Sequence, residues 1–350
     1  MAIASPSLQV AALAAMNPPD SFIAPVLFPR CAVPGAAMKP GENEYKATAY
    51  RVTKNNNRSK PGEVSLEMQP GHRPNRIYST LEDYAVSSKV YEVDHPVSDY
   101  ARPTLEAFGI TNYAADVAMP EVMETLRLDR ERRAVAFLSN TANFGGNTAG
   151  TWGDDNNDPI EQLDAAIRSI LLGFGTPSPE QGHALDFVLS DDAWRAFRNN
   201  AKVRARFKIT EDTPVLPSEL SGFITKVLAI GDNPLPVRIR VSYAQDGGGA
   251  NEGQTFTPAF LLANKAALVV SCKASTIPLA SIPGSGAIAA RAQSELRWRS
   301  WGRGYSMLDP TIKTIELEDT SELIFRGVHA TTDTLYDATG GYLWTAPASS

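Results

Sequence analysis

Glu121-Val-Met-Glu-Thr-Leu-Arg-Leu-Asp-Arg-Glu-Arg-Arg-Ala-Val-Ala-Phe-Leu138 is the longest uninterrupted helical signal in the chain. It contains no Gly or Pro and is rich in Glu, Arg, Leu, Met and Ala, so intrinsic propensity favours a helix of several turns. Pro120 suits the first helical position, and Asn140 marks a stop. We therefore expect one long helix and interpret the rest of the chain as arranged around it.

The apolar face of this helix is interrupted in its middle by arginines. At 3.6 residues per turn, Arg130 and Arg133 fall within the face that otherwise collects Met119, Val122, Met123, Leu126, Ala134 and Phe137. The helix is therefore predicted to be buried at its ends. Its central turns are predicted to be either exposed to solvent or in contact with a partner. A solvated charged face and a contact with a neighbouring subunit both fit these charges. The helix is long but its apolar face is narrow. This combination favours a supporting helix that spans the molecule over a helix buried in the core.

Composition limits the class of protein. The chain has 350 residues, 43% hydrophobic and 21% charged, which is sufficient for a core and for two domains. Its formal net charge of −6 argues against a dedicated nucleic-acid binder, whose surface would be strongly basic. Cys31 and Cys272 have no Cys or His at ligand spacing, so we interpret them as structural thiols in a reducing compartment. No apolar run approaches the roughly 18–20 residues that cross a bilayer, and no basic residue precedes the apolar residues 8–16, so the protein is expected to be soluble and not secreted.

Two N-terminal segments carry apolar residues that they cannot bury by themselves. Prolines punctuate residues 1–40 and predict an extended arm, whose apolar residues 22–28 must lie on another surface. Strands are expected over 45–52 and 84–93, with a long polar segment between them. Because an isolated hairpin is marginal in water, we expect arm and hairpin to rest on a neighbour. The alternative for the arm is that it wraps its own domain.

The remainder of the chain is predicted to be a mixed α/β middle followed by strands. Helices are expected over 158–172 with Asp158 as N-cap, over 190–197 with Ser190 as N-cap, and over 217–225. Strands are expected at 186–189, 237–243, 266–271, 295–299, 311–317, 322–328 and 342–344. The strand at 266–271 is continuously apolar, which predicts a central position. β-rich segments that flank an α/β middle indicate one domain inserted into another.

No catalytic, cofactor-binding or metal-binding residue is predicted. None of the histidines lies within a helical turn of another His, Cys or Glu in a ligand pattern, and the chain lacks the glycine signatures of nucleotide-binding loops. Adjacent acids at 154–155 and 191–192 are typical of caps and solvated charge. One local pattern of nucleic-acid contact interleaves Arg297, Arg299 and Arg303 with Trp298, Trp301 and Tyr305. A half-buried strand has the same pattern, and we favour that interpretation.

The order of these parts resembles that of the major capsid proteins of tailed bacteriophages with the HK97-type fold. The matching motifs are Ile23-Ala-Pro-Val-Leu-Phe-Pro29, Tyr84-Ala-Val-Ser-Ser-Lys-Val90, Leu128-Asp-Arg-Glu-Arg-Arg-Ala-Val-Ala-Phe-Leu138, Trp152 with Asp158-Pro-Ile160, Phe187-Val-Leu-Ser-Asp-Asp-Ala-Trp194 and Gly340-Gly-Tyr-Leu-Trp344. The resemblance spans nearly the whole length. Its motifs are packing and turn signals, and it is their order that is specific.

The resemblance implies an α+β fold of the HK97 type with five parts. They are an N-terminal arm (1–40), an extended β-hairpin or E-loop (41–95), a P-domain with the long spine helix (96–154), an inserted α/β A-domain (155–305) and C-terminal P-domain strands (306–350). The implied function is that of a major capsid protein and not an enzyme, without cofactor or metal. Such a protein assembles into hexamers and pentamers of an icosahedral shell around phage double-stranded DNA.

The resemblance also implies partners and a location. Copies of the chain would meet within capsomers and between neighbouring capsomers, with decoration, scaffolding and portal proteins as further candidate partners. Contact with packaged DNA would be weak and non-specific, and no membrane is involved. The location would be the virion capsid, assembled in the host bacterial cytoplasm.

The expected inter-subunit contacts come from the arm, the hairpin and the long helix. They are Phe22, Ile23, Val26, Leu27, Phe28, Tyr45, Tyr50, Arg51, Lys54, Arg58, Lys60, Arg130 and Arg133. Some family members crosslink an E-loop lysine to an asparagine of a neighbour, and Lys54 and Lys60 occupy that region. Two other functions stay open at this point: an encapsulin-like bacterial compartment that carries enzyme cargo, and an enzyme of unknown class.

Overall fold

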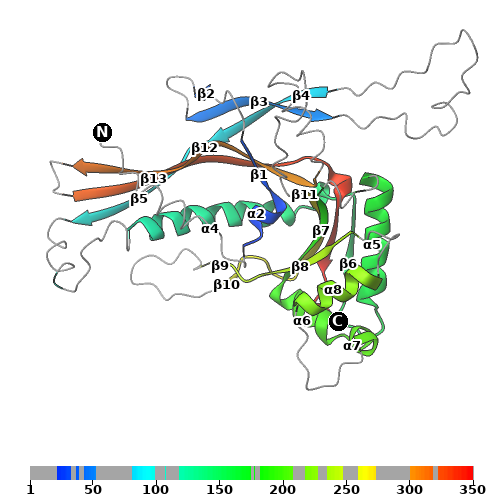
Figure 1. Cartoon of the computed structure of the whole chain (residues 1–350). Coiled ribbons are helices and arrows are strands. Elements are labelled where there is room, and N and C mark those ends of the chain that lie inside the picture. The colour runs from blue at the N-terminus through cyan, green and yellow to red at the C-terminus, as the bar shows by residue number, and fades with distance from the viewer. Residues whose placement is uncertain are drawn as a thin grey trace, which may run out of the picture.

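A computed structural model describes most of the chain between residues 22 and 349. The described residues are 22–32, 37–38, 43–52, 81–98, 107, 118–174, 177, 182–207, 217–227, 235–246, 259–272, 300–317 and 322–349. They form an elongated part, which contains the long helix α4 (Met119–Leu138), and a compact α/β part at one end of that helix (Figure 1). Helix α4 begins one residue before Pro120, so the long helix expected from the sequence is confirmed.

The elongated part is a four-stranded sheet laid along α4. Its strand order is β1 (Arg30–Ala32), β12 (Gly302–Leu317), β13 (Glu322–Leu335) and β5 (Tyr91–Ser98). Strands β12 and β13 form a long antiparallel pair, with register shifts on both sides of Leu308. The first half of α4 packs on this sheet, where Val122 and Leu126 share a cluster with Ile312 and Phe325. This apolar packing attaches the first half of α4 to the sheet.

The predicted hairpin is present, but its second strand begins and ends earlier than expected. Strand β3 (Glu44–Val52) pairs antiparallel with β4 (Leu81–Lys89), and β2 (Ala37–Met38) adds to the outer edge of β3. The expected strand over 84–93 is divided at Val90, whose N–H donates to the carbonyl of Asn43 at 3.2 Å. After this residue the chain leaves the hairpin and enters β5 in the sheet on α4. The polar segment 53–80 lies outside the described residues.

The compact part is a five-stranded sheet covered by helices. The strand order is β6 (Gly146–Gly150), β14 (Gly341–Ala346), β11 (Ala266–Cys272), β7 (His183–Ser190) and β8 (Val237–Ser242). Strand β11 is central and every one of its residues is buried, as its continuous apolar sequence predicts. Strand β14 was expected among the C-terminal strands of the elongated part. It instead lies between β6 and β11, because Leu343 and Trp344 belong to the core of the compact part and of its junction with α4.

Three of the four helices of the compact part follow their sequence signals, and α7 was not expected. They are α5 (Pro159–Phe174), α6 (Asp191–Asn199), α7 (Ala201–Phe207) and α8 (Pro217–Val227). Asp158 Oδ1 accepts hydrogen bonds from the N–H of Ile160 at 3.0 Å and of Glu161 at 3.3 Å, and Ser190 Oγ accepts one from Ala193 at 3.2 Å. Both predicted N-caps are therefore confirmed.

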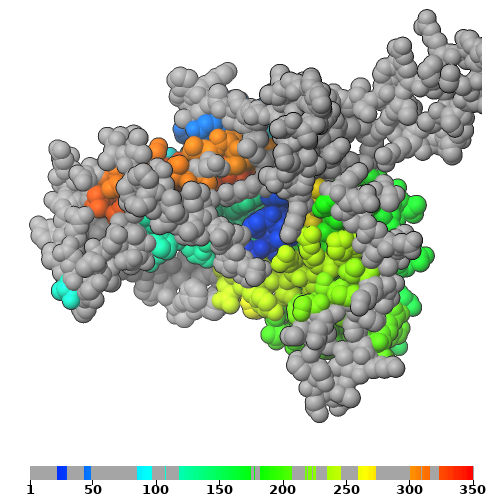
Figure 2. Space-filling model, viewed as in Figure 1, coloured from blue at the N-terminus to red at the C-terminus, as the bar shows by residue number. Residues whose placement is uncertain are grey.

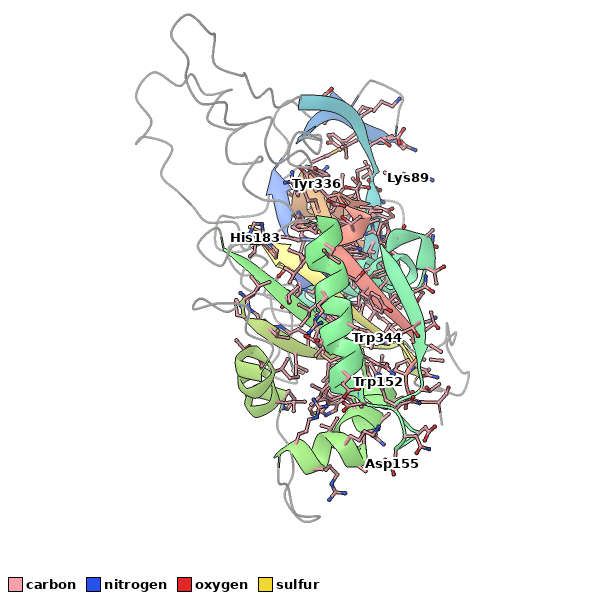
Figure 3. The ribbon with its side chains drawn as sticks, turned by 90° about the vertical axis from the view of Figure 1, so that its right-hand side faces the viewer. Lys89, Trp152, Asp155, His183, Tyr336 and Trp344 are labelled. Atoms are coloured by element: carbon pink, nitrogen blue, oxygen red, sulfur yellow. The ribbon has the colours of Figure 1, made fainter. Side chains whose placement is uncertain are left out.

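An aromatic core lies beneath α5. Trp152 and Trp344 lie near each other in Figure 3, with ring centroids 5.4 Å apart, and Phe187 and Phe197 complete the group. Short elements finish the described chain: η3 (Thr141–Asn143), β9 (Gln245–Asp246), β10 (Ala259–Phe260) and η6 (Ala338–Gly340). The predicted strand at 295–299 lies outside the described residues.

Candidate assembly surfaces

The described part of the N-terminal arm is folded onto its own chain. The prolines predicted an extended segment, but Pro25 lies in the first turn of a short helix, α2 (Ala24–Leu27), where its missing N–H has no consequence. Phe22, Ile23, Leu27 and Phe28 are each at most 8% exposed. The expectation of an arm that needs a neighbour therefore does not describe these four residues. The alternative, in which the arm wraps its own domain, does.

The surface that buries the arm is the junction between the two parts of the molecule. The Phe28 ring lies 5.2 Å from that of Phe137 on α4 and 5.6 Å from that of Trp301. Trp301 is fully buried and donates from Nε1 to the carbonyl of Asn143 at 2.8 Å. Ala134, Val135 and Leu138 from the second half of α4 join the same cluster, together with Val269 of β11. The arm thus fastens the elongated part to the compact part. Val26, the remaining apolar arm residue predicted as a contact, is half-buried.

Glu131, in the centre of α4, holds the start of α2. Its carboxylate accepts hydrogen bonds from the N–H of Ile23 at 2.9 Å and of Ala24 at 2.9 Å. These are N–H groups that a helix start leaves without intrahelical partners. The residue is completely buried, and this burial raises the pKa of Glu131 although the two N–H donors and Arg130 act to lower it.

Arg130, next to Glu131 in the centre of α4, makes a second connection between the helix and other elements. Its Nη2 donates to Asp333 Oδ1 at 2.9 Å and to the carbonyl of Phe28 at 2.9 Å. The Arg130 and Asp333 side chains are 7% and 6% exposed. One guanidinium therefore connects α4, β13 and the arm. This pair is not visible in the sequence, since its members are 203 residues apart and Asp333 belongs to no motif.

Arg133 is engaged in the same sheet. Its Nη1 donates to the carbonyl of Thr331 at 3.0 Å, and its guanidinium carbon lies 4.0 Å from the centre of the Tyr91 ring. Of the two states expected for the middle of α4, the partnered one is observed, and the partners belong to the same chain. Arg130 and Arg133 were predicted as contacts with a neighbour. The described structure gives both a role within the chain, and their contact with a neighbour stays a prediction.

The predicted nucleic-acid pattern is part of the core where it is described. Trp301, Arg303 and Tyr305 are each at most 2% exposed, and the Arg303 guanidinium carbon lies 3.9 Å from the centre of the Tyr336 ring. The described residues of this pattern therefore offer no surface to a nucleic acid, and residues 301–305 are buried throughout instead of half-buried as expected. The other members of the pattern, residues 297–299, lie outside the described residues.

The hairpin base has one face on its own chain and one face in solvent. Val86 and Ser88 are each 3% exposed and face inward near β13, and Tyr45, opposite Ser88, is half-buried. Lys46, Thr48, Ser87 and Lys89 are exposed. Tyr50 and Arg51 lie on β3, while Lys54, Arg58 and Lys60 lie outside the described residues. The outer face of the base is therefore a polar surface open to a partner.

Three exposed apolar side chains add candidate contacts that sequence patterns did not single out. Leu172 on α5 is 88% exposed, and Tyr243 and Phe260 are 46% and 37% exposed, with their rings 6.3 Å apart. No group of metal-ligating side chains occurs within the described ranges. Among the helices of those same ranges, none is long and apolar enough to cross a membrane.

The chain is similar in structure to several solved proteins. A phage-related protein from Bordetella bronchiseptica aligns over 100% of both chains, with a TM-score of 0.66 and 16% identity. The capsid of cyanophage P-SCSP1u aligns over 92% of this chain and 87% of its own, with a TM-score of 0.49 and 9% identity. A virus-like particle from Pyrococcus furiosus aligns over 96% of this chain and 97% of its own, with a TM-score of 0.48 and 11% identity. No family model and no curated protein matches the chain.

The fold shared with the phage-related protein from Bordetella bronchiseptica agrees with the fold that the order of sequence motifs implied. The mixed helix and sheet architecture expected from the sequence is likewise present.

Proposed function

We propose that this chain is the major capsid protein of a tailed phage, and that it assembles into hexamers and pentamers of an icosahedral shell around double-stranded DNA. The observation that carries the proposal is the fold shared with a phage-related protein over the full length of both chains. Its role would be structural and its location the virion capsid. The acidic net charge of −6 suits a shell that encloses DNA and binds it weakly. Extensive neutralisation of the DNA phosphates would oppose release of the DNA from the shell.

The internal connections of the chain support a building block that keeps its shape. The arm, α4 and β13 are joined by Arg130, and the arm is joined to α4 again by Glu131. Apolar packing around Trp301 joins the same elements to the compact part. A shell subunit must transmit contact forces between neighbours, and such a fastened junction keeps the two parts from moving independently.

The hairpin is the element that we assign to contacts between copies. Its base presents Lys46, Ser87 and Lys89 to solvent, and the contact residues predicted from the sequence on this element are Tyr45, Tyr50, Arg51, Lys54, Arg58 and Lys60. We assign the segment 53–80, between β3 and β4, to the surface of an adjacent subunit. A crosslink from Lys54 or Lys60 would appear as a ladder of covalent multimers on a denaturing gel of assembled particles.

Electron microscopy of particles purified from expressing cells tests the proposal. We expect closed icosahedral shells, and DNA inside them when the other phage components are present. Closed shells filled with an enzyme would instead identify the encapsulin-like compartment. A chain that forms no particle at all contradicts both shell functions.

A further inference from the structure

A cavity of about 220 Å³ lies between the arm, α4 and β12. The apolar side chains of Met123, Leu126, Phe22 and Pro310 form part of its wall, and Arg127 contributes a guanidinium. The register shifts of β12 beside Leu308 fall next to Pro310, at the place where the strand borders this cavity. At ~30 Å³ for each water molecule, the volume corresponds to about seven waters, enough for a short side chain. Figure 2 shows the arm segment, in blue, at the surface of this face of the molecule.

Among the described residues at the cavity, Arg130 and Glu131 have buried partners, whereas Arg127 is only partly matched. Arg130 is paired with Asp333, and Glu131 accepts the N–H groups of the arm. Arg127 Nε and Nη2 are buried and have no hydrogen-bond partner among the described residues. Its Nη1 lies 3.6 Å from Glu124, a side chain that is 53% exposed. Burial also lowers the pKa of Arg127, as expected for a cation whose loss of water is incompletely compensated.

An arginine with two buried and unused N–H groups is a site for a carboxylate. The planar guanidinium binds the two oxygens of a carboxylate side by side, whereas the apolar wall suits the methylene groups that carry such a carboxylate. The chain holds 39 acidic residues against 33 basic ones, so a sister copy has carboxylates in excess. Buried donors without partners cost stability, and an incoming carboxylate removes that cost.

We infer that the Arg127 cavity receives an aspartate or glutamate side chain of a second copy of this chain. The inference rests on the proposed self-assembly and adds to it a specific contact on α4. On this inference Arg127 lowers the stability of the isolated chain and raises the stability of the assembly.

Substitution separates these two effects. Arg127→Met keeps much of the side-chain volume and removes the charge, and Arg168→Met is the matched control. Arg168 lies on α5, is 73% exposed and pairs with Asp164 four residues away. We expect R127M to unfold at the same or a higher urea concentration than the wild type, and to require at least a tenfold higher protein concentration for assembly. R168M should assemble as the wild type does. An R127M chain that assembles at the wild-type concentration overturns the inference and leaves the proposed shell function intact.

Crosslinking identifies the carboxylate and does not depend on R127M. In R127K the introduced amine can be joined to an adjacent carboxylate by a carbodiimide, which forms an amide and releases a urea. Assembly from a mixture of ¹⁴N- and ¹⁵N-labelled R127K then shows by mass spectrometry whether the two peptides come from different copies. We expect a mixed-isotope amide between position 127 and an aspartate or glutamate. A crosslink within one copy only, or none at position 127 while other lysines react, overturns the inference. A chain that remains monomeric at high concentration overturns it together with the proposed function.

Discussion

Arg130 and Asp333 are 203 residues apart in the sequence and are joined by two hydrogen bonds, of 2.9 Å from Nη2 to Oδ1 and of 3.3 Å from Nε to Oδ2. The same Nη2 also donates to the carbonyl of Phe28. The pair therefore connects the long helix, the C-terminal sheet and the arm at one point. Breaking this connection would remove the arm's hydrogen bond to α4 and the link between α4 and β13.

Removal of one member of this pair should be more costly than removal of both. Asp333→Leu leaves a buried guanidinium without its counter-charge, and we expect a loss of about 3–5 kcal/mol in the free energy of unfolding. The double variant Arg130→Met with Asp333→Leu should be less destabilised than Asp333→Leu alone. Urea unfolding of the unassembled chain measures both. Equal losses in the single and double variants would show that the ion pair is not the origin of the effect.

The stability of the wild type should depend on the protonation of Glu131. Burial raises the pKa of Glu131 in the folded chain above the ordinary value of 4.5. At a pH between the ordinary pKa and the raised pKa, the folded chain therefore binds more protons than the unfolded chain. The contribution of this group is therefore largest below the ordinary pKa and decreases as the pH rises toward the raised one. We expect the free energy of unfolding of the wild type, minus that of Glu131→Gln, to decrease as the pH rises through this interval. A difference that grows as the pH rises there would contradict the direction of the shift.

Gly327 should tolerate no side chain while Val122 is opposite. A Cβ at Gly327 would come within 2.2 Å of Val122 Cγ1, so Gly327→Ala should destabilise the chain by about 1–3 kcal/mol. Val122→Ala in the same chain should recover part of this loss. The control is Gly222→Ala in α8, where nothing lies within 4 Å and a gain of about 0.5–1 kcal/mol is expected from helix propensity. Thermal unfolding compares the three, and an unaffected Gly327→Ala would refute the close packing of β13 on α4.

Deletions should divide the arm into two functionally different segments. Removal of residues 1–21 spares every described contact of the arm, so the chain should still unfold cooperatively. Removal of residues 1–29 exposes the junction around Trp301 and should abolish cooperative unfolding. Phe28→Ala tests the same point with one substitution, for which we expect a loss of about 3–5 kcal/mol because Phe28 is fully buried. If the longer deletion unfolds as the shorter one does, the arm is not part of the core.

The sequence predicted the features that depend on neighbouring residues. Pro120 at the start of α4, the caps Asp158 and Ser190 and the apolar run of β11 are local signals, and each is present in the structure. The break at Val90 was missed, because strand propensity continues through it and only the pairing of β4 and β5 with different sheets reveals it. The placement of β14 and the partners of Arg130 depend on contacts between distant segments. The cavity beside Arg127 was likewise invisible, since its wall comes from the arm, α4 and β12.

Shortening the hairpin tests the central claim most directly. The pair Val52 and Leu81 is the last described pair of β3 and β4, so residues 53–80 can be replaced by Asn-Gly, which forms a two-residue turn between antiparallel strands. Electron microscopy and sedimentation of this variant and the wild type, at equal concentration, should show closed shells for the wild type only. The variant should remain folded. A wild-type protein that sediments as a monomer, or a shortened variant that forms the same shells, would contradict the account.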